Sequence, residues 1–406
     1  MSCSAEGMNK RFSPRVVFYT RPAYLDSAFP LVSALSRKIE THLIVEVSPE
    51  ERGIGTFSPP LIDSPAGLVS EDRLPGWPPR SLRERLNSLR SLHLAVFDAQ
   101  RAFHPWCLAT CWKIARFIRS VRPHVVHFDE ASTRAAGILY FLPRTPLILS
   151  IHDSQPHNGR MKHSFKLVRW LFLQRVNGLI FHSVFSREAF DDVGSMRRVG
   201  ENVAVIPLGI FDLLRTGRDG VGRRDERTVL FFGRMSPYKG LETLAAAAPR
   251  IAERVPNLRL VIAGRPLPGY EVPVVSPLAN GGTCEWRVGH IADDEMCELF
   301  ERAAVVVVPY VTASQSGVVS TAYGFRKPVV ATSVGGLPEM VVDGVTGRVV
   351  APGDPDALAA AIGDLLLDAE ERGRMSERIR QKEEGELAWP RLADMTIGVY
   401  QRALGG

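Results

Sequence analysis

Cysteine is scarce in this chain, and the few cysteines are scattered. Among 406 residues only Cys3, Cys107, Cys111, Cys284 and Cys297 occur. An odd and dispersed set argues against a disulfide-built secreted domain and predicts reduced thiols in a cytoplasmic protein. Cys107 and Cys111 stand one helical turn apart, which suits either a metal or two buried thiols. No His or Cys pair occurs elsewhere at matching spacing, and this favours buried thiols.

Long apolar runs and the glycine signatures of two enzyme classes are also missing. No stretch reaches the ~20 apolar residues of a transmembrane helix, and residues 1–14 contain no apolar signal core. We therefore expect at most a peripheral contact with a membrane. Neither half has a Gly-x-Gly-x-x-Gly after its first strand, which argues against a nicotinamide dehydrogenase, and no Walker A sequence occurs.

The charge balance is mildly basic. The net charge is +6 and the pI is about 9.2. Such a balance favours an anionic partner, for example a nucleotide, a phosphate or an acidic membrane surface. The Lys and Arg residues are dispersed and no RNA- or DNA-binding motif is present, so we expect no nucleic-acid partner.

Short apolar runs alternate with helical stretches along most of the chain, which predicts parallel sheets covered by helices on both faces. The expected strands of the first half are 15–20, 41–47, 125–128, 147–151, 179–182 and 203–206. Those of the second half are 229–232, 259–263, 285–288, 305–308 and 328–331. Between them lies an arginine- and glycine-rich linker. The pattern predicts two Rossmann-like domains, 1–211 and 228–388, a linker at 212–227, and a helix over 389–406 that packs back toward the first domain.

Residues 81–121 show helical periodicity, with basic residues on one face and Leu, Val, Phe and Trp on the other. Two interpretations are open. These helices cover the surface of the domain, or they form a basic amphipathic surface that meets a membrane or a lipid-linked acceptor. Residues 49–80 are rich in Pro and Gly and are expected to form a long excursion.

The segment GRMSPYKG follows the expected strand 229–232 and carries two cations. Gly233 lets the chain turn, Arg234 and Lys239 lie five residues apart, and a helix is expected to begin near Leu241. Two fixed cations near a helix N-terminus suit a diphosphate, and each charge-assisted hydrogen bond contributes roughly 1.5–3 kcal/mol. The alternative is a pair of solvated surface charges.

His152 follows the strand 147–151 directly. In an open α/β sheet, ligands bind beyond the carboxyl ends of the strands. A histidine there hydrogen-bonds a ligand or carries a proton. The alternative is a structural histidine at a strand end.

The loop after the strand 305–308 contains Ser314, Gln315 and Ser316 and no charged side chain. The amides of Ser316, Gly317 and Val318 are expected to open the next helix and to form an anion cradle, because they lack helical acceptors. A little further on, Gly335 and Gly336 allow close backbone approach to a ligand, with Glu339 on the next turn.

Asp354-Pro355-Asp356 has the Asp-x-Asp form that binds a divalent metal in some sugar transferases. Here it precedes the apolar run ALAAAIGDLLLD. An aspartate at the N-cap with proline at the first helical position is typical of a helix start, so we expect no metal there.

These pieces, in this order, resemble glycosyltransferase family 4, whose fold is GT-B: two Rossmann-like domains facing a cleft. The resemblance spans roughly residues 15–385, with 49–110 mostly outside it. It is most specific in the second half, in VLFFGRMSPYKGLETL, HIADDEMCELFERAAVVVVPY and KPVVATSVGGLPEMVVDGVTGRVVAPGDPDALAAAI. In the first half, VRPHVVHF, LILSIHD and VAVIPLGI are similar but weaker.

The resemblance implies a retaining, metal-independent glycosyltransferase that uses a nucleotide diphosphate sugar as co-substrate and needs no cofactor. Arg234 and Lys239 would bind the donor diphosphate, and His152 would face the donor sugar. The acceptor would be a glycan, a lipid-linked sugar or a small molecule. The expected donor-binding residues are Gly233, Ile291, Gln315, Ser316, Gly317, Val318, Thr321 and Glu339.

The chain departs from the family pattern in two places. The usual Gly-rich loop near the first strand is replaced by RPAYLDSAF, so Tyr24, Leu25 and Asp26 are expected to reshape the acceptor side. The usual Glu-x7-Glu pair falls on Ala313 and Thr321. We expect Gln315 and Thr321 to be neutral replacements for the two carboxylates, because an amide both donates and accepts and a hydroxyl accepts hydrogen bonds.

Two further interpretations stay open at this point. The missing glutamates are compatible with a non-catalytic partner or binding subunit that has a degenerate donor site. The other interpretation is a different enzyme on the same fold, such as a nucleotide-sugar epimerase or a phosphorylase.

Overall fold

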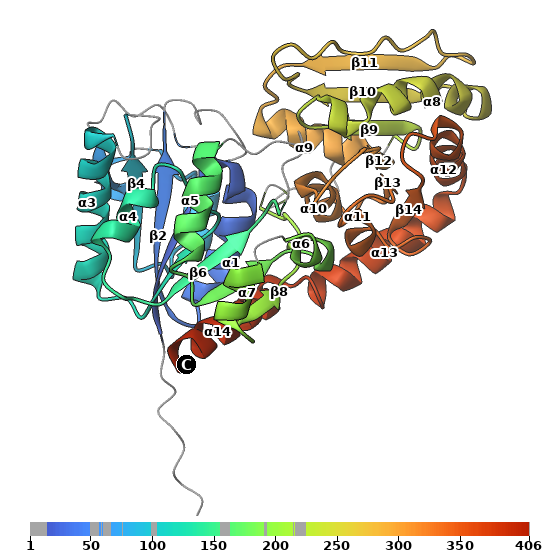
Figure 1. The fold of residues 1–406 in the computed structure, drawn as a ribbon. Helices are drawn as coiled ribbons and strands as arrows, with labels where there is room; N and C mark the ends of the chain where they lie inside the picture. The colour runs from blue at the N-terminus through green and yellow to red at the C-terminus, as the bar shows by residue number, and fades with distance from the viewer. Residues whose placement is uncertain are drawn as a thin grey trace, which may run out of the picture.

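The computed structural model describes residues 14–48, 57, 59, 66–74, 76–98, 104–154, 163–190, 193–213, 215 and 225–405. They form two α/β domains, each built on its own sheet (Figure 1). Both domains have the doubly wound arrangement that the alternating pattern predicts.

The first sheet has, within the described residues, the strand order β3-β4-β2-β1-β5-β6-β7-β8, and only the β3–β4 pair is antiparallel. Its strands are β1 (Arg15–Thr20), β2 (Glu40–Val47), β3 (Gly67–Ser70), β4 (Ser91–Val96), β5 (Val125–Phe128), β6 (Leu147–Ile151), β7 (Gly178–Phe181) and β8 (Val203–Val205). Its helices are α1 (Leu25–Ser36), α2 (Arg80–Arg85), α3 (Pro105–Val121), α4 (Ala136–Phe141), α5 (His163–Leu173), α6 (Val184–Glu188) and α7 (Val193–Val199). Central strands such as β5 and β6 are buried at every position because helices cover both faces.

The prediction of continuous helix over 81–121 is wrong. Residues 91–96 form β4, which pairs with β2 on one side and β3 on the other. In SLHLAV, Leu92 and Leu94 are buried while Ser91 and His93 are only partly so, which is the alternation of a strand. Leucine suits both a helix and a strand. The strands β2 and β3 that pair with this segment come from other parts of the sequence, so local sequence does not show them.

The second sheet is parallel throughout, in the order β11-β10-β9-β12-β13-β14. Its strands are β9 (Thr228–Phe232), β10 (Arg259–Gly264), β11 (Thr283–Val288), β12 (Val305–Val308), β13 (Val329–Thr332) and β14 (Gly347–Val350). Its helices are α8 (Leu241–Arg254), α9 (Asp293–Arg302), α10 (Gly317–Gly324), α11 (Leu337–Met340), α12 (Pro355–Leu367) and α13 (Ala369–Glu384). The strands predicted for this half are confirmed to within one or two residues at each end.

The last helix, α14 (Trp389–Gly405), returns to the first domain, as predicted (Figure 1). Leu392, Val399 and Tyr400 are buried in the same core as α1 and β1. The Tyr400 hydroxyl lies 2.7 Å from Nδ1 of His127, so a core histidine of β5 is partnered by the end of the chain. The two domains are therefore linked both through the segment before β9 and through α14.

Three local predictions also have clear outcomes. Asp354 caps α12 by accepting hydrogen bonds from the amides of Asp356 and Ala357, so this segment is a helix start. Cys107 and Cys111 are buried thiols whose sulfurs lie 3.7 and 3.1 Å from the carbonyl oxygen of Arg134. Of the expected linker, position 214 and residues 216–224 lie outside the described part of the chain.

Candidate active site

The two domains contact each other through loops that follow the strands of their sheets. His152 comes directly after β6, and Gln315 lies between β12 and α10. The side-chain amide nitrogen of Gln315 is 3.2 Å from Nδ1 of His152. Nearby, the Ser183 hydroxyl donates to the carbonyl of Ser314 at 3.3 Å. The structure therefore brings together two predicted site residues, one from each domain.

His152 is enclosed on nearly every side and only 4% exposed. Its Nε2 lies 2.7 Å from a carboxylate oxygen of Asp129, which follows β5. The ring of Tyr24 stacks on the imidazole, with centroids 4.0 Å apart and planes 15° from parallel. Tyr24 belongs to the segment RPAYLDSAF, and its ring covers one face of the histidine.

Asp129 and His152 form a buried ion pair. Burial on its own lowers the pKa of His152, but the carboxylates of Asp129 and Glu130 outweigh it and hold the pKa above its usual value. Burial likewise opposes ionisation of Asp129, yet His152 and the hydroxyl of Thr20, 2.8 Å away, keep its pKa low. The imidazolium form is thus stabilised where the two domains touch.

A second buried charge cluster supports the loop that carries Asp129. Glu46 of β2 pairs with Arg134 at 3.1 Å and accepts hydrogen bonds from the hydroxyls of Tyr19 and Ser132. Glu46 is fully buried and Arg134 is 7% exposed. Removal of either member would leave a buried charge without its partner, so the pair holds Arg134 and the segment that follows Asp129 in place.

Glu130 is held in an unusual backbone conformation, with φ of 111°. Its carboxylate accepts hydrogen bonds from the backbone amides of Ala131 and His152, at 3.0 and 2.9 Å. Positive φ in a residue other than glycine is costly and is often found at functional sites. The strand-end pair Asp129-Glu130 was missed by sequence reasoning, although two acids directly after a buried strand were a visible signal.

His182, at the end of β7, lies beside His152 with ring centroids 4.5 Å apart. Its Nδ1 bonds the carbonyl of Ile206 at 2.9 Å, so Nε2 carries the lone pair, and that buried atom has no partner. Burial lowers the pKa of His182 to about 3, which keeps the ring neutral. Among the described residues, Asp129, His152 and His182 form a group with metal-ligand spacing, but two of the ligand atoms already bond each other.

The loop after β9 places Gly233, Arg234 and Lys239 at the same end of the second sheet. Gly233 turns the chain at φ of 113°, and Arg234 is exposed. Lys239 is half-buried, with its ammonium 3.7 Å from the ring centroid of Tyr310. Burial, reinforced by Arg234, lowers its pKa to about 8. The predicted cation pair is present, and one of its members is easily neutralised.

The start of α10 lies against this cation loop. A side chain on Gly233 would come within 3.5 Å of Val318, and one on Gly240 within 1.8 Å of the carbonyl oxygen of Pro309. Gly240 also has φ of 65°, so only glycine fits there without strain. As the first helical residues, Gly317 and Val318 have amides without an intrahelical acceptor. Cations and free amides therefore share one small region.

Two family models match this chain. Residues 226–368 match "Glycosyl transferases group 1" and residues 69–211 match "Glycosyltransferase Family 4". The uncharacterized glycosyltransferase MJ1607 of Methanocaldococcus jannaschii is 33% identical over 299 residues, which are 69% of this chain and 75% of that protein. The chain belongs to the glycosyltransferase family. A D-inositol 3-phosphate glycosyltransferase of Mycobacterium tuberculosis is 34% identical over 187 residues, 45% of this chain and 38% of that protein.

Solved structures establish the fold of this glycosyltransferase as GT-B. The Anabaena protein Alr3699/HepE in complex with UDP has a TM-score of 0.64 at 18% identity, covering 95% of this chain and 99% of its own. An Escherichia coli structure described as trehalose-6-phosphate bound with UDP-2-fluoro glucose has a TM-score of 0.63 at 12% identity, covering 95% and 99%.

Ala313 and Thr321 are the two positions where the resemblance places the family's glutamate pair; Ala313 lies before α10 and Thr321 lies within it. Ala313 is buried, and its carbonyl accepts the amide of Gly336 at 3.3 Å. Gly335 has φ of 54°, and a side chain there would come within 1.5 Å of the same carbonyl oxygen. The Thr321 hydroxyl donates to the carbonyl of Gly317 at 3.0 Å, which leaves its lone pairs available.

The remaining predicted donor residues lie at the edges of this region. Ser316 is the N-cap of α10, and its amide donates to the sulfur of Met340 at 3.4 Å. Ile291 is half-buried and packs against a hydrophobic core of the second domain. Glu339 accepts hydrogen bonds from the amides of Val184 and Phe185, at 2.7 and 2.8 Å. Its carboxylate thus bonds the other domain in this structure, and its contact with a donor stays a prediction.

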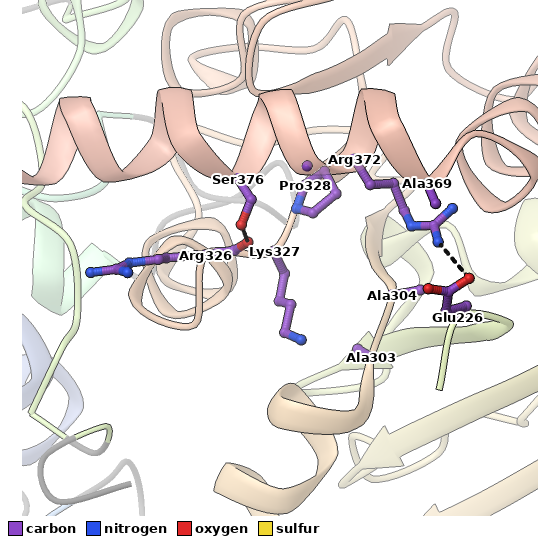
Figure 2. Close-up of a pocket in the computed structure, with 10 residues that line it drawn as sticks. Glu226, Ala303, Ala304, Arg326, Lys327, Pro328, Ala369, Arg372 and Ser376 are labelled. Carbon is purple, nitrogen blue, oxygen red and sulfur yellow. Dashed lines mark hydrogen bonds and ion pairs between the residues drawn. The ribbon is translucent and has the colours of Figure 1, made fainter. Parts of the chain in front are cut away.

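A separate pocket lies at the opposite, amino-terminal edge of the second sheet (Figure 2). Its charged residues are already engaged: Lys327 donates to the carbonyl of Glu301 at 2.7 Å, and Arg372 pairs with Glu226 at 3.5 Å. Ligands of open α/β sheets bind at the carboxyl ends. We therefore place the candidate active site in the interdomain region and not in this pocket.

Proposed function

We propose that this glycosyltransferase moves a sugar from a nucleotide diphosphate sugar to a glycan, lipid-linked or small-molecule acceptor, with retention of configuration and without a metal. The observation that carries the proposal is the packing of the loop that holds Arg234 and Lys239 against the start of α10, where a Cβ on Gly233 would lie 3.5 Å from Val318. Fixed cations and oriented amides stabilise negative charge that develops on a departing diphosphate. The UDP-bound and UDP-sugar-bound structural neighbours support a nucleotide-sugar donor.

Gln315 is the side chain that we assign to the donor sugar. When His152 is neutral, the amide nitrogen of Gln315 donates to Nδ1, and Oε1 is a buried atom without a partner. When His152 is charged, the amide turns over and its oxygen accepts instead. In either state one amide atom is left for a sugar hydroxyl. Direct contact between His152 and the sugar requires Gln315 or Tyr24 to move, because these two side chains cover the ring.

Calorimetric titration with a panel of nucleoside diphosphates tests the donor site. We expect one of them to bind and Arg234→Ala to weaken its affinity on the order of tenfold to a hundredfold, the loss of a charge-assisted hydrogen bond. Arg378→Ala, an exposed arginine of α13, is the matched control and should bind normally. Binding that is absent, or that is equal in wild type and Arg234→Ala, contradicts the proposal.

Retention and metal independence need their own measurements. The anomeric configuration of the first product, followed by NMR, should equal that of the donor. A chelator should leave turnover unchanged. Loss of turnover on chelation would direct attention to Asp129, His152 and His182, the described group with metal-ligand spacing.

The second candidate function is a non-catalytic partner or binding subunit. It is favoured by the replacement of both expected carboxylates by Ala313 and Thr321. Turnover of any nucleotide sugar by the purified protein alone eliminates it. Nucleoside diphosphate binding with activity only in the presence of a second protein would support it.

A further inference from the structure

The outer face of α3, α4 and α5 exposes a group of large aromatic and apolar side chains. We call it the aromatic-basic face. Its apolar members are, with their exposed fractions, Trp106 (71%), Trp112 (44%), Tyr140 (84%), Leu167 (53%) and Trp170 (51%). The three helices lie side by side on one side of the first sheet, and α4 contacts both of the others (Figure 1). Single exposed apolar residues are normal on a soluble surface, whereas a group of them on neighbouring helices is typical of an interaction site.

The charged residues of this face are all of one sign. Exposed cations lie on or next to the same helices: Lys113, Arg116 and Arg119 on α3, Arg144 after α4, and Lys166 on α5. The guanidinium of Arg116 lies 5.6 Å from the ring centroid of Trp112. Helices α3, α4 and α5 contain no Asp or Glu. Residues 99–187 contain thirteen Lys and Arg but only three acids, of which Asp129 and Glu130 are buried. Such a face is electrostatically complementary to an anionic surface.

A helix of the second domain shows what an ordinary solvated face of this chain contains. On α13, cations alternate with acids and pair with them: Arg374 with Glu370, Arg380 with Glu377 and Glu384, and Lys382 with Glu386. No Trp, Tyr or Phe occurs in that helix. The aromatic-basic face therefore differs from α13 both in its lack of acids and in its gathering of aromatic residues.

We propose that the aromatic-basic face docks on the surface of an anionic lipid bilayer. Trp and Tyr rings have an apolar body and a polar edge and are enriched at membrane interfaces, while flanking Lys and Arg are attracted by anionic headgroups. None of the described helices is long and apolar enough to span a bilayer, so the contact is peripheral. A second copy of the chain is disfavoured as the occupant because two such faces repel each other.

Docking in this way places the active site close to the lipid surface. Helix α5 follows His152 along the chain, and Trp106 lies in the first turn of α3, which follows β4; both helices run antiparallel to their strands. Their amino ends are therefore at the sheet edge that carries His152. An acceptor with a lipid anchor can reach this edge from the bilayer. This last step, unlike the docking itself, rests on the proposed function.

Vesicle co-sedimentation with the full chain tests the docking. We expect binding to vesicles that contain phosphatidylglycerol, weaker binding at high salt, and little binding to phosphatidylcholine alone. Arg116→Glu with Arg119→Glu should lower partitioning by at least about twenty-five-fold, since each of the two basic side chains near the surface contributes about a factor of five. Trp106→Ala should also lower it. Arg374→Glu with Arg378→Glu on α13 reverses the same number of charges and should have no effect.

A second measurement needs no variant. Tryptophan fluorescence of the wild type should shift to the blue on addition of anionic vesicles, because Trp106, Trp112 and Trp170 leave water. Equal binding to both lipid compositions, no binding to the anionic vesicles, or a heparin complex without vesicle binding overturns the proposal. Nucleoside diphosphate titration of the same variants should be unchanged, which keeps this outcome separate from the donor-site test.

Discussion

The two domains present polar groups at their facing strand ends in opposite ways. The second domain offers cations and free amides that are exposed or half-buried, set on a loop shaped by Gly233 and Gly240. The first domain offers a buried ion pair, Asp129 with His152, backed by the Glu46–Arg134 pair. A charged ligand needs groups that it can reach, so the second domain is suited to hold the diphosphate. The first domain is suited to hold the side chain of His152 in a fixed position.

The buried and the exposed charges should also differ in how much they contribute to the stability of the fold. Buried charges are costly to desolvate and are retained only in a satisfied network, so removal of one member is expensive. Exposed cations contribute little to stability and are free to contribute to binding. Substitutions in the first domain should therefore change stability most, and those in the second should change ligand affinity most.

The largest effect should come from Asp129→Ala. It leaves the imidazole of His152 buried without its partner, and we expect the free energy of unfolding to fall by about 3–5 kcal/mol. Urea denaturation measures it. Asp129→Asn keeps the shape and should cost less. An unchanged midpoint for Asp129→Ala would mean that the pair is not a structural element of the first domain.

The same pair predicts a pH window for stability. Because the folded pKa of His152 is raised, its contribution is complete below about pH 6.5 and is lost as the pH rises through the folded value. Because that of Asp129 is lowered, its contribution is present above about pH 4 and is lost as the pH falls through the folded value. Stability from the pair should be greatest between these limits, and Asp129→Ala should reduce the loss of stability on either side of them.

A smaller effect should appear at Lys239 in the second domain. Its pKa of about 8 means that the ammonium is charged below that pH and neutral above it. Nucleoside diphosphate affinity should thus fall as the pH rises through 8, by up to about tenfold per pH unit. Lys239→Arg should remove this dependence, because arginine stays charged. The same slope in both proteins would show that another group controls it.

The smallest effect should come from Gln315→Ala, at the point where the domains meet. Loss of one neutral hydrogen bond costs about 1 kcal/mol, or roughly fivefold in donor affinity. Gln381→Ala on exposed α13 is the control. Affinity and turnover that both stay at the wild-type level would remove Gln315 from the donor site.

The sequence predicted the second domain better than the first, because the predicted features of the second domain depend on residues that are close together in the chain. Strand 305–308, the helix start near Leu241 and the cap at Asp354 each depend on neighbours in the chain. In the first domain β4 was interpreted as helix, because a leucine-rich segment fits both periods until a pairing strand is known. Asp129, Glu46 and Arg134 were not predicted as site residues, because they come from separate segments and only the folded sheet brings them together.

What the sequence determined by itself is the two-domain α/β pattern, the cation loop and the amino-terminal amides of α10. These depend on hydrophobic period, glycine and helix capping, all of which act over a few residues. Only the tertiary structure decided that His152 is paired and covered, that Gln315 bonds it, and that Glu339 bonds the opposite domain. The protonation of a buried group is set by the charges around it, and those around His152 are Asp129 and Glu130, which follow β5, and Asp153, which follows β6.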